Sequence, residues 1–223
     1  MFRCGFLARS VDRERCRDGE AQQCSQEKVV VISAFVLSFA LIFVAELGDK
    51  SQLMALAFAT RYPPLTVLTG IGVATAVVHA LSVALGAGLG AALPTRVISM
   101  AAAVAFVAFG LWTLRGDRLS EQERERAARP TRHGILSVGG VFFLAELGDK
   151  TMLATIALAA DHGWFGTWLG STLGMVAADA LAIVAGRLLG TRLPERAIRV
   201  GAAVAFFAFG ALLLVEALRA SQR

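Results

Sequence analysis

Two short charged segments recur in this chain, and they hold the side chains best suited to chemistry. Glu46-Leu-Gly-Asp-Lys-Ser51 returns 100 residues later as Glu146-Leu-Gly-Asp-Lys-Thr151. In a helix, a spacing of three places the glutamate and the aspartate of each segment on one face. Carboxylate and hydroxyl oxygens are the ligands of hard cations such as calcium, manganese and magnesium. The two segments therefore predict a cation site lined by oxygen atoms.

The predicted ligands are four carboxylates and the two hydroxyl groups that follow them: Glu46, Asp49, Glu146, Asp149, Ser51 and Thr151. Lys50 and Lys150 are possible charge partners, and Gly48 and Gly148 leave room for a kink or for exposed carbonyl groups. Crowded carboxylates also accept protons when a metal leaves, so exchange of a cation for protons is chemically natural. A purely structural alternative is that each glutamate neutralises the lysine four residues later while two helices pack.

The sequence around these charges is typical of a membrane protein. Of its 223 residues, 56% are hydrophobic and only 17% are charged, whereas an average soluble domain is about 25% charged. Stretches without a charged residue, such as 62–95 and 97–114, approach or exceed the length of a transmembrane helix. This composition argues against a soluble enzyme and against a disordered chain. The formal net charge of +5 is interpreted as membrane orientation, so lipid is expected around the protein and nucleic acid is not.

An internal duplication organises the chain. When residues 41–110 are aligned with 141–210 without a gap, 28 of the 70 positions are identical. Each half divides into three apolar spans, predicted at 33–59, 65–90 and 95–114 and at 135–160, 164–188 and 197–216. Because three is odd, the second half must enter the membrane from the opposite side. We therefore predict an all-α integral membrane protein with six transmembrane helices arranged as two inverted three-helix repeats.

The charged segments outside these spans set the predicted domains and orientation. Residues 1–28 form a charged tail expected to be disordered, whose Cys4, Cys16 and Cys24 make no closed disulfide framework. Residues 29–114 and 134–223 are the two repeats, and residues 115–133 are a charged linker with six arginines. The positive-inside rule places this linker in the cytoplasm and both termini outside, in a plasma membrane of the bacterial type.

The charged motifs lie at the predicted centre of the membrane. The motif of the second half is midway between His133 and Asp161, the nearest ionisable residues on either side. An ionised group at that depth costs about 2.5–3.5 kcal/mol on insertion scales, and such residues mark functional sites. His79 and Asp179 occupy matching positions in the second spans and are candidates for a cavity or a proton relay. Gln52 and Ser82 are candidates to line the same path.

The paired motifs resemble the E-x-G-D-[KR]-[TS] signatures of the Gdt-type calcium/manganese:proton exchangers. The resemblance covers the chain from about Val29 onward, including the six spans and the charged linker, but not the N-terminal tail. It implies that the four acids of the motifs bind the transported cation and exchange protons.

We therefore expect a secondary transporter that exchanges manganese, calcium or both for protons by alternating access around a four-carboxylate site at the midplane. No enzymatic activity and no cofactor are expected, and the divalent cation and the protons are the substrates. One alternative is a transporter of amino acids or other organic cations. A second is an intramembrane aspartyl protease that uses Asp49 and Asp149, but the additional glutamate and lysine of each motif fit that chemistry poorly.

Overall fold

The computed structural model describes residues 26, 28–115, 121, 122, 125, 134–189 and 195–220, and throughout this part of the chain the only regular structure is helix. The predicted N-terminal tail with its three cysteines and most of the predicted linker lie outside the described residues.

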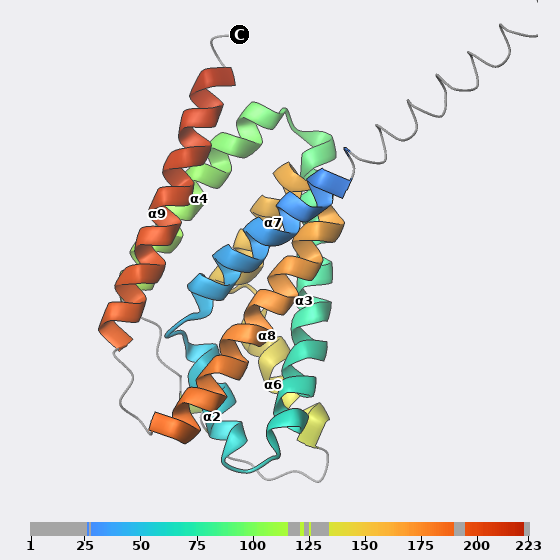
Figure 1. Ribbon diagram of the computed structural model, residues 1–223. Coiled ribbons are helices and arrows are strands. Elements are labelled where there is room, and N and C mark those ends of the chain that lie inside the picture. Colours follow the sequence, from blue (N-terminus) through green and yellow to red (C-terminus); the bar gives the residue numbers. More distant parts are fainter. Residues whose placement is uncertain are drawn as a thin grey trace, which may run out of the picture.

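Helices of ten or more residues follow one another along the described chain (Figure 1). They are the first helix Lys28–Glu46, then α2 Lys50–Ala59, α3 Pro64–Ala92, α4 Thr95–Arg115, α6 Gly134–Glu146, α7 Lys150–His162, α8 Trp164–Leu189 and α9 Glu195–Ala220. Proline begins α3, where its fixed φ and its lack of an N–H group suit a helix start.

Five segments are long and apolar enough to cross a membrane by length and composition: Lys28–Glu46, Pro64–Ala92, Thr95–Arg115, Trp164–Gly186 and Val200–Arg219. Gly134–Glu146 is equally apolar in character but shorter. Large apolar side chains such as Leu136 and Val104 stay exposed on the outer faces, where lipid would cover them. The prediction of an all-α membrane protein is confirmed, whereas the count of six spans stays a prediction.

The predicted first spans of the two halves are each interrupted in the structure. Segments 33–59 and 135–160 are each divided into two helices by a turn, at residues 47–49 and 147–149. Gly48 and Gly148 in these turns have φ of 75° and 80°. This left-handed conformation ends an α-helix and is readily adopted only by glycine. The kink expected from the two glycines is therefore a complete break in the helix.

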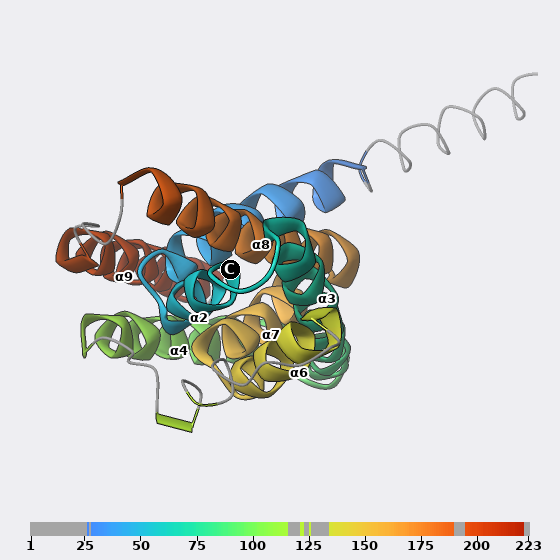
Figure 2. The same cartoon turned by 90° about the horizontal axis from the view of Figure 1, so that it is seen from below.

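Two helices stand at one edge of the bundle, where α4 and α9 lie side by side in both views (Figures 1 and 2). Repeated phenylalanines join them, with the rings of Phe106 and Phe206 6.0 Å apart and those of Phe106 and Phe209 4.8 Å apart. Phe106 and Phe206 are fully buried beside apolar residues of the first helix, α7 and α8. The aromatic repeat therefore connects this helix pair to the rest of the bundle.

Close approach of other helices depends on glycine. A Cβ atom on Gly86 of α3 would overlap the carbonyl oxygen of Ile156 on α7, and one on Gly90 would lie 2.7 Å from the carbonyl oxygen of Ala160. These two glycines form a Gly86-x-x-x-Gly90 pattern that lets the backbones of α3 and α7 approach closely. At the matching position in α8, Gly186 faces the side chain of Leu56 on α2. The second residue of that pattern, Gly190, lies outside the described residues.

A second row of glycines lies on α8 and was not predicted from the sequence. Cβ atoms on Gly166, Gly170 and Gly174 would overlap or crowd the carbonyl oxygens of Val31, Phe35 and Phe39 in the first helix, which lies against α8 in Figure 1. These three glycines are four residues apart and therefore form one stripe along the helix. They allow the first helix, which ends at the first acidic motif, to pack backbone to backbone on α8.

Gly86→Ala is expected to destabilise the protein, because the added methyl group would also lie 2.8 Å from the Cβ of Ala159. Overpacking of this kind costs about 1–3 kcal/mol. Gly88→Ala is the matched control, since a Cβ atom at Gly88 meets nothing within 4 Å. Thermal unfolding of the purified protein in detergent would measure both variants. Equal midpoints for the two would contradict the close α3–α7 contact.

Candidate functional site

Both acidic motifs lie where a helix is interrupted. The first helix ends at Glu46, and α2 begins directly after Asp49; α6 ends at Glu146, and α7 begins directly after Asp149. Each turn is closed by the same hydrogen bond, in which the aspartate N–H donates to the glutamate carbonyl oxygen, at 3.1 Å in the first turn and 3.2 Å in the second. The two turns therefore share this closing hydrogen bond, and each presents two acids from adjacent helix ends.

Neither aspartate caps the helix that follows it. Asp49 and Asp149 occupy the N-cap positions of α2 and α7, yet neither makes a side-chain capping hydrogen bond. Aspartate at this position commonly accepts a hydrogen bond from the first turn of its helix. Both carboxylates are instead available to groups from elsewhere in the bundle, while the positive ends of two helix dipoles lie close to them.

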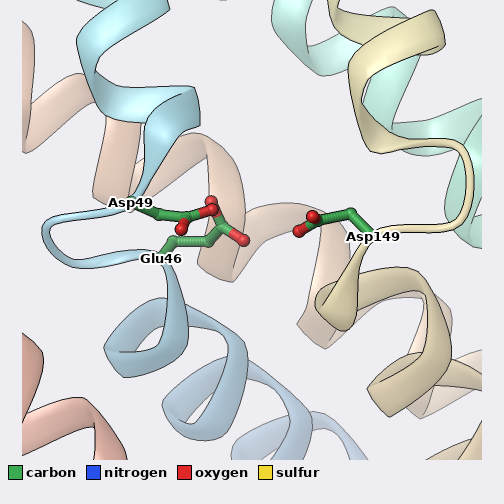
Figure 3. A group of neighbouring side chains, drawn as sticks. All are labelled: Glu46, Asp49 and Asp149. Carbon is green, nitrogen blue, oxygen red and sulfur yellow. The ribbon is translucent and has the colours of Figure 1, made fainter. Parts of the chain in front are cut away.

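Three acids from the two halves converge in the interior. Figure 3 shows the carboxylates of Glu46 and Asp49 beside each other, with the carboxylate of Asp149 pointing toward them from the opposite chain segment. One ligand atom from each of these residues lies within 4.8 Å of the others. All three side chains are buried, with relative exposures of 0%, 3% and 4%. Such a group can hold a metal ion through oxygen atoms alone.

Glu146 is buried close to this group but is not a member of it. Its Oε2 accepts a hydrogen bond of 3.2 Å from Thr151, and the hydroxyl of Ser51 makes the equivalent bond to Oε2 of Glu46. The second oxygen of each glutamate, Oε1, is buried without a hydrogen-bond partner among the described residues. A buried carboxylate oxygen of this kind is well placed to accept a cation or a proton.

The lysines of the motifs pair across the two halves. Lys150 Nζ lies 2.6 Å from Oδ1 of Asp49, and Lys50 Nζ lies 3.4 Å from Oδ1 of Asp149. Lys50 also donates a hydrogen bond of 3.2 Å to the carbonyl oxygen of Ala145. The sequence allowed pairing within each motif at a spacing of four residues, but the helix breaks between glutamate and lysine. The described ion pairs of the motif lysines instead join one half to the other.

Gln52 connects the first motif to a neighbouring helix. Its Oε1 accepts a hydrogen bond of 2.8 Å from the Gly48 N–H, and its Nε2 donates one of 2.9 Å to the carbonyl oxygen of Ala178 on α8. Asp179 follows directly and is fully buried, and both of its carboxylate oxygens lack a hydrogen-bond partner among the described residues. In the second motif, Met152 takes the place of Gln52, and its sulfur accepts the Gly148 N–H at 3.2 Å.

The two remaining candidates lie on α3. His79 is buried, and its Nδ1 is 3.4 Å from the Thr172 hydroxyl on α8, so it spans the contact between the two second helices of the halves. Ser82 donates to the carbonyl oxygen of Val78 at 2.8 Å, which ties it to its own helix. Among the described residues, Gln52 thus bonds to the first motif, His79 lies in a helix–helix contact, and the hydrogen bond of Ser82 stays within its own helix.

Sequence reasoning overlooked three hydroxyl groups. Ser38, Thr155 and Ser171 are completely buried, and their hydroxyls have no hydrogen-bond partner among the described residues. Helical spacing could have identified two of them, because Ser38 precedes Glu46 by two turns and Thr155 follows Thr151 by one turn. Both therefore lie on the faces of their helices that carry motif residues.

Known proteins provide an independent comparison. The family model described as "Divalent cation/proton antiporter GDT1" matches residues 34–121 and 134–221. A Vibrio cholerae protein named "Putative manganese exporter" is 33% identical over 172 residues, which cover 76% of this chain and 84% of that protein. "GDT1-like protein sll0615" of Synechocystis sp. is 32% identical over 197 residues, covering 80% of this chain and 95% of that protein.

A chloroplast protein is also similar: "Protein PAM71, chloroplastic" of Arabidopsis thaliana is 33% identical over 213 residues, covering 83% of this chain and 58% of that protein. No solved structure matches. The family match falls on both halves of the chain and includes both acidic motifs. The family is one of transporters, which agrees with the expectation that the chain is not an enzyme and leaves no support for the protease alternative. This chain belongs to the GDT1 family of divalent cation/proton antiporters.

Proposed function

We propose that this protein exchanges manganese or calcium for protons across a membrane, with the buried acids of the two motifs as the cation site. The observation that carries this proposal is the group formed by Glu46, Asp49 and Asp149, which unites acids from both halves within 4.8 Å in an apolar bundle. Ser51, Thr151 and Glu146 complete the proposed ligand set, since each is buried and lies in a motif. The name of the Vibrio cholerae relative, "Putative manganese exporter", supports manganese.

The proposed mechanism is alternating access between two inverted three-helix repeats, residues 29–114 and 134–223, in which each broken helix pair counts as one span. A difference between matching helix contacts supports it. Gly86 on α3 faces the α7 backbone at Ile156, whereas Gly186 on α8 faces the Leu56 side chain on α2. Two contacts related by the duplication thus involve different groups, a difference expected if the two sides of the site are not packed alike.

Protons would use the same acids after the cation leaves, because crowded carboxylates repel one another until some are protonated. Asp179 is proposed as a further proton carrier, supported by its complete burial, its two unpartnered oxygens and its position beside the Gln52 contact. We propose a relay or cavity role for His79 on its burial at the α3–α8 contact. Ser82 is the weakest candidate, since its hydroxyl bonds to its own helix.

The proposed location is a plasma membrane of the bacterial type, with the linker at 115–133 in the cytoplasm and both termini outside. The arginines of the linker support this orientation through the positive-inside rule. The charged residues 1–28 are proposed to form a tail outside the two repeats.

Asp149→Asn is expected to lower manganese flux in proteoliposomes to the leak of protein-free vesicles, because the amide removes a negative charge from the cation site while preserving side-chain shape. Asp161→Asn is the matched control, since Asp161 lies near the other end of α7, roughly 18 Å away along the helix. Competition by calcium, amino acids and organic cations in the wild-type protein would identify the substrate class. Wild-type flux in Asp149→Asn would refute the proposed site.

A pH gradient is expected to drive the cation. Manganese efflux from loaded vesicles should accelerate when the external medium is made about one pH unit more acidic, which supplies about 1.4 kcal/mol per proton. Reversing the gradient should slow the efflux, and an ionophore that collapses it should remove both effects. Identical flux under all of these conditions would refute proton coupling while leaving the cation site intact.

A further inference from the structure

The two motif lysines bind the same acids that are proposed to bind the cation. Lys150 Nζ is 2.6 Å from Oδ1 of Asp49, a distance expected of a strong charge-assisted hydrogen bond. Lys50 Nζ is 3.4 Å from Oδ1 of Asp149. Asp49 and Asp149 are two of the three members of the acidic group. Each lysine therefore supplies positive charge to one carboxylate of the proposed site.

An ammonium group and a divalent cation compete for these carboxylates for two reasons. Metal ions such as calcium bind oxygen at about 2.3–2.6 Å, so a cation that uses Oδ1 of Asp49 would occupy space that the ammonium group now fills. Both species are positively charged, and their repulsion is strong in a buried site, where the effective dielectric constant is low. The lysine need not lose its proton for this competition, because movement of its flexible side chain is sufficient.

We propose, on the basis of the proposed function, that Lys50 and Lys150 are tethered cations that neutralise the empty site and that the transported cation displaces. Each lysine starts α2 or α7 in one half and reaches an aspartate of the other half. Their displacement thus breaks ion pairs that connect the two halves. Binding of the cation and freedom of the halves to move are coupled through these two side chains.

The two pairs differ in a way that sets the order of displacement. The Lys150 and Asp49 side chains are each 2% exposed, and their pair is short. The Lys50 side chain is 17% exposed, and its contact with Asp149 is longer by 0.8 Å. Because Lys50 is the more exposed of the two lysines, we expect an entering cation to displace it first. Lys150 stays paired with Asp49 until the cation reaches that carboxylate.

A purely structural role for the lysines predicts a different response to substitution. If Lys150 only held the halves together, its loss would weaken the cation-loaded protein at least as much as the empty protein, and cation affinity would fall or stay unchanged. If Lys150 competes with the cation, its loss weakens mainly the empty protein, and affinity rises. The sign of the change in cation affinity therefore separates the two roles.

The experiment measures manganese binding by the full-length protein in detergent at pH 8, by titration calorimetry and by the manganese-induced shift in Tm. Lys150→Met should lower the Kd for manganese by about tenfold or more and enlarge the Tm shift. Lys50→Met should change both in the same direction by a smaller factor. Lys150→Arg retains a tethered cation and should keep the Kd near the wild-type value.

Lys28→Met is the matched control, because Lys28 is an exposed lysine at the start of the first helix and should leave the Kd unchanged. An unchanged or higher Kd in both Lys50→Met and Lys150→Met, with a normal wild-type Kd, would overturn the proposed competition alone. Lys50 is partly exposed, so its variant tests the idea even if Lys150→Met fails to fold. A wild-type protein that binds neither manganese nor calcium would overturn the proposed function together with this inference.

Discussion

The architecture depends on one constraint: charges in the interior of an apolar bundle must be neutralised by other groups of the protein. Two lysines and several acids lie close together in the described chain, and each motif lysine is paired with the aspartate of the other motif. Removing either half would leave buried charges without their partners, at a cost of several kcal/mol for each ion. The two copies of the motif are therefore mutually dependent, which gives a physical reason for a duplicated sequence to fold as one bundle.

The breaks in the first helices make this pairing possible. In an unbroken helix, each lysine would lie one turn after its own glutamate and could pair within the motif. The positive φ of Gly48 and Gly148 ends the helix before the aspartate, so the lysine begins a new helix in a different direction. The same breaks leave peptide groups at the ends of short helices close to the acids. Irregular backbone inside a membrane is tolerated where it faces a polar site of this kind.

Much of the fold and of the candidate site follows from the sequence, because apolar length and duplication are strong patterns. The all-helical fold, the start of α4 at Thr95 and the burial of the four motif acids agree with prediction. The helix breaks were anticipated only as kinks, since a glycine in an apolar segment also occurs in continuous membrane helices. Crossed lysine pairs depend on how two distant segments meet, which local spacing does not encode. The roles of the site residues remain proposals.

The two halves differ in sequence outside the motifs, and this difference bears on the proposed exchange. The motifs are nearly identical, yet residues 61–80 and 161–180 share only two identities, Gly70 with Gly170 and Ala80 with Ala180. His79 on α3, which contacts Thr172 of α8, occupies the position that Asp179 occupies in the other half. Likewise, Met152 replaces Gln52 beside the second turn. In the proposed alternating-access mechanism, two identical halves would give two conformations of equal energy, related by the two-fold axis between the halves. Different flanking helices would make those energies unequal, and binding of the cation or of protons would shift the balance between them. In this proposal the nearly identical motifs serve binding from either side, and the asymmetric surroundings set which conformation the empty protein prefers.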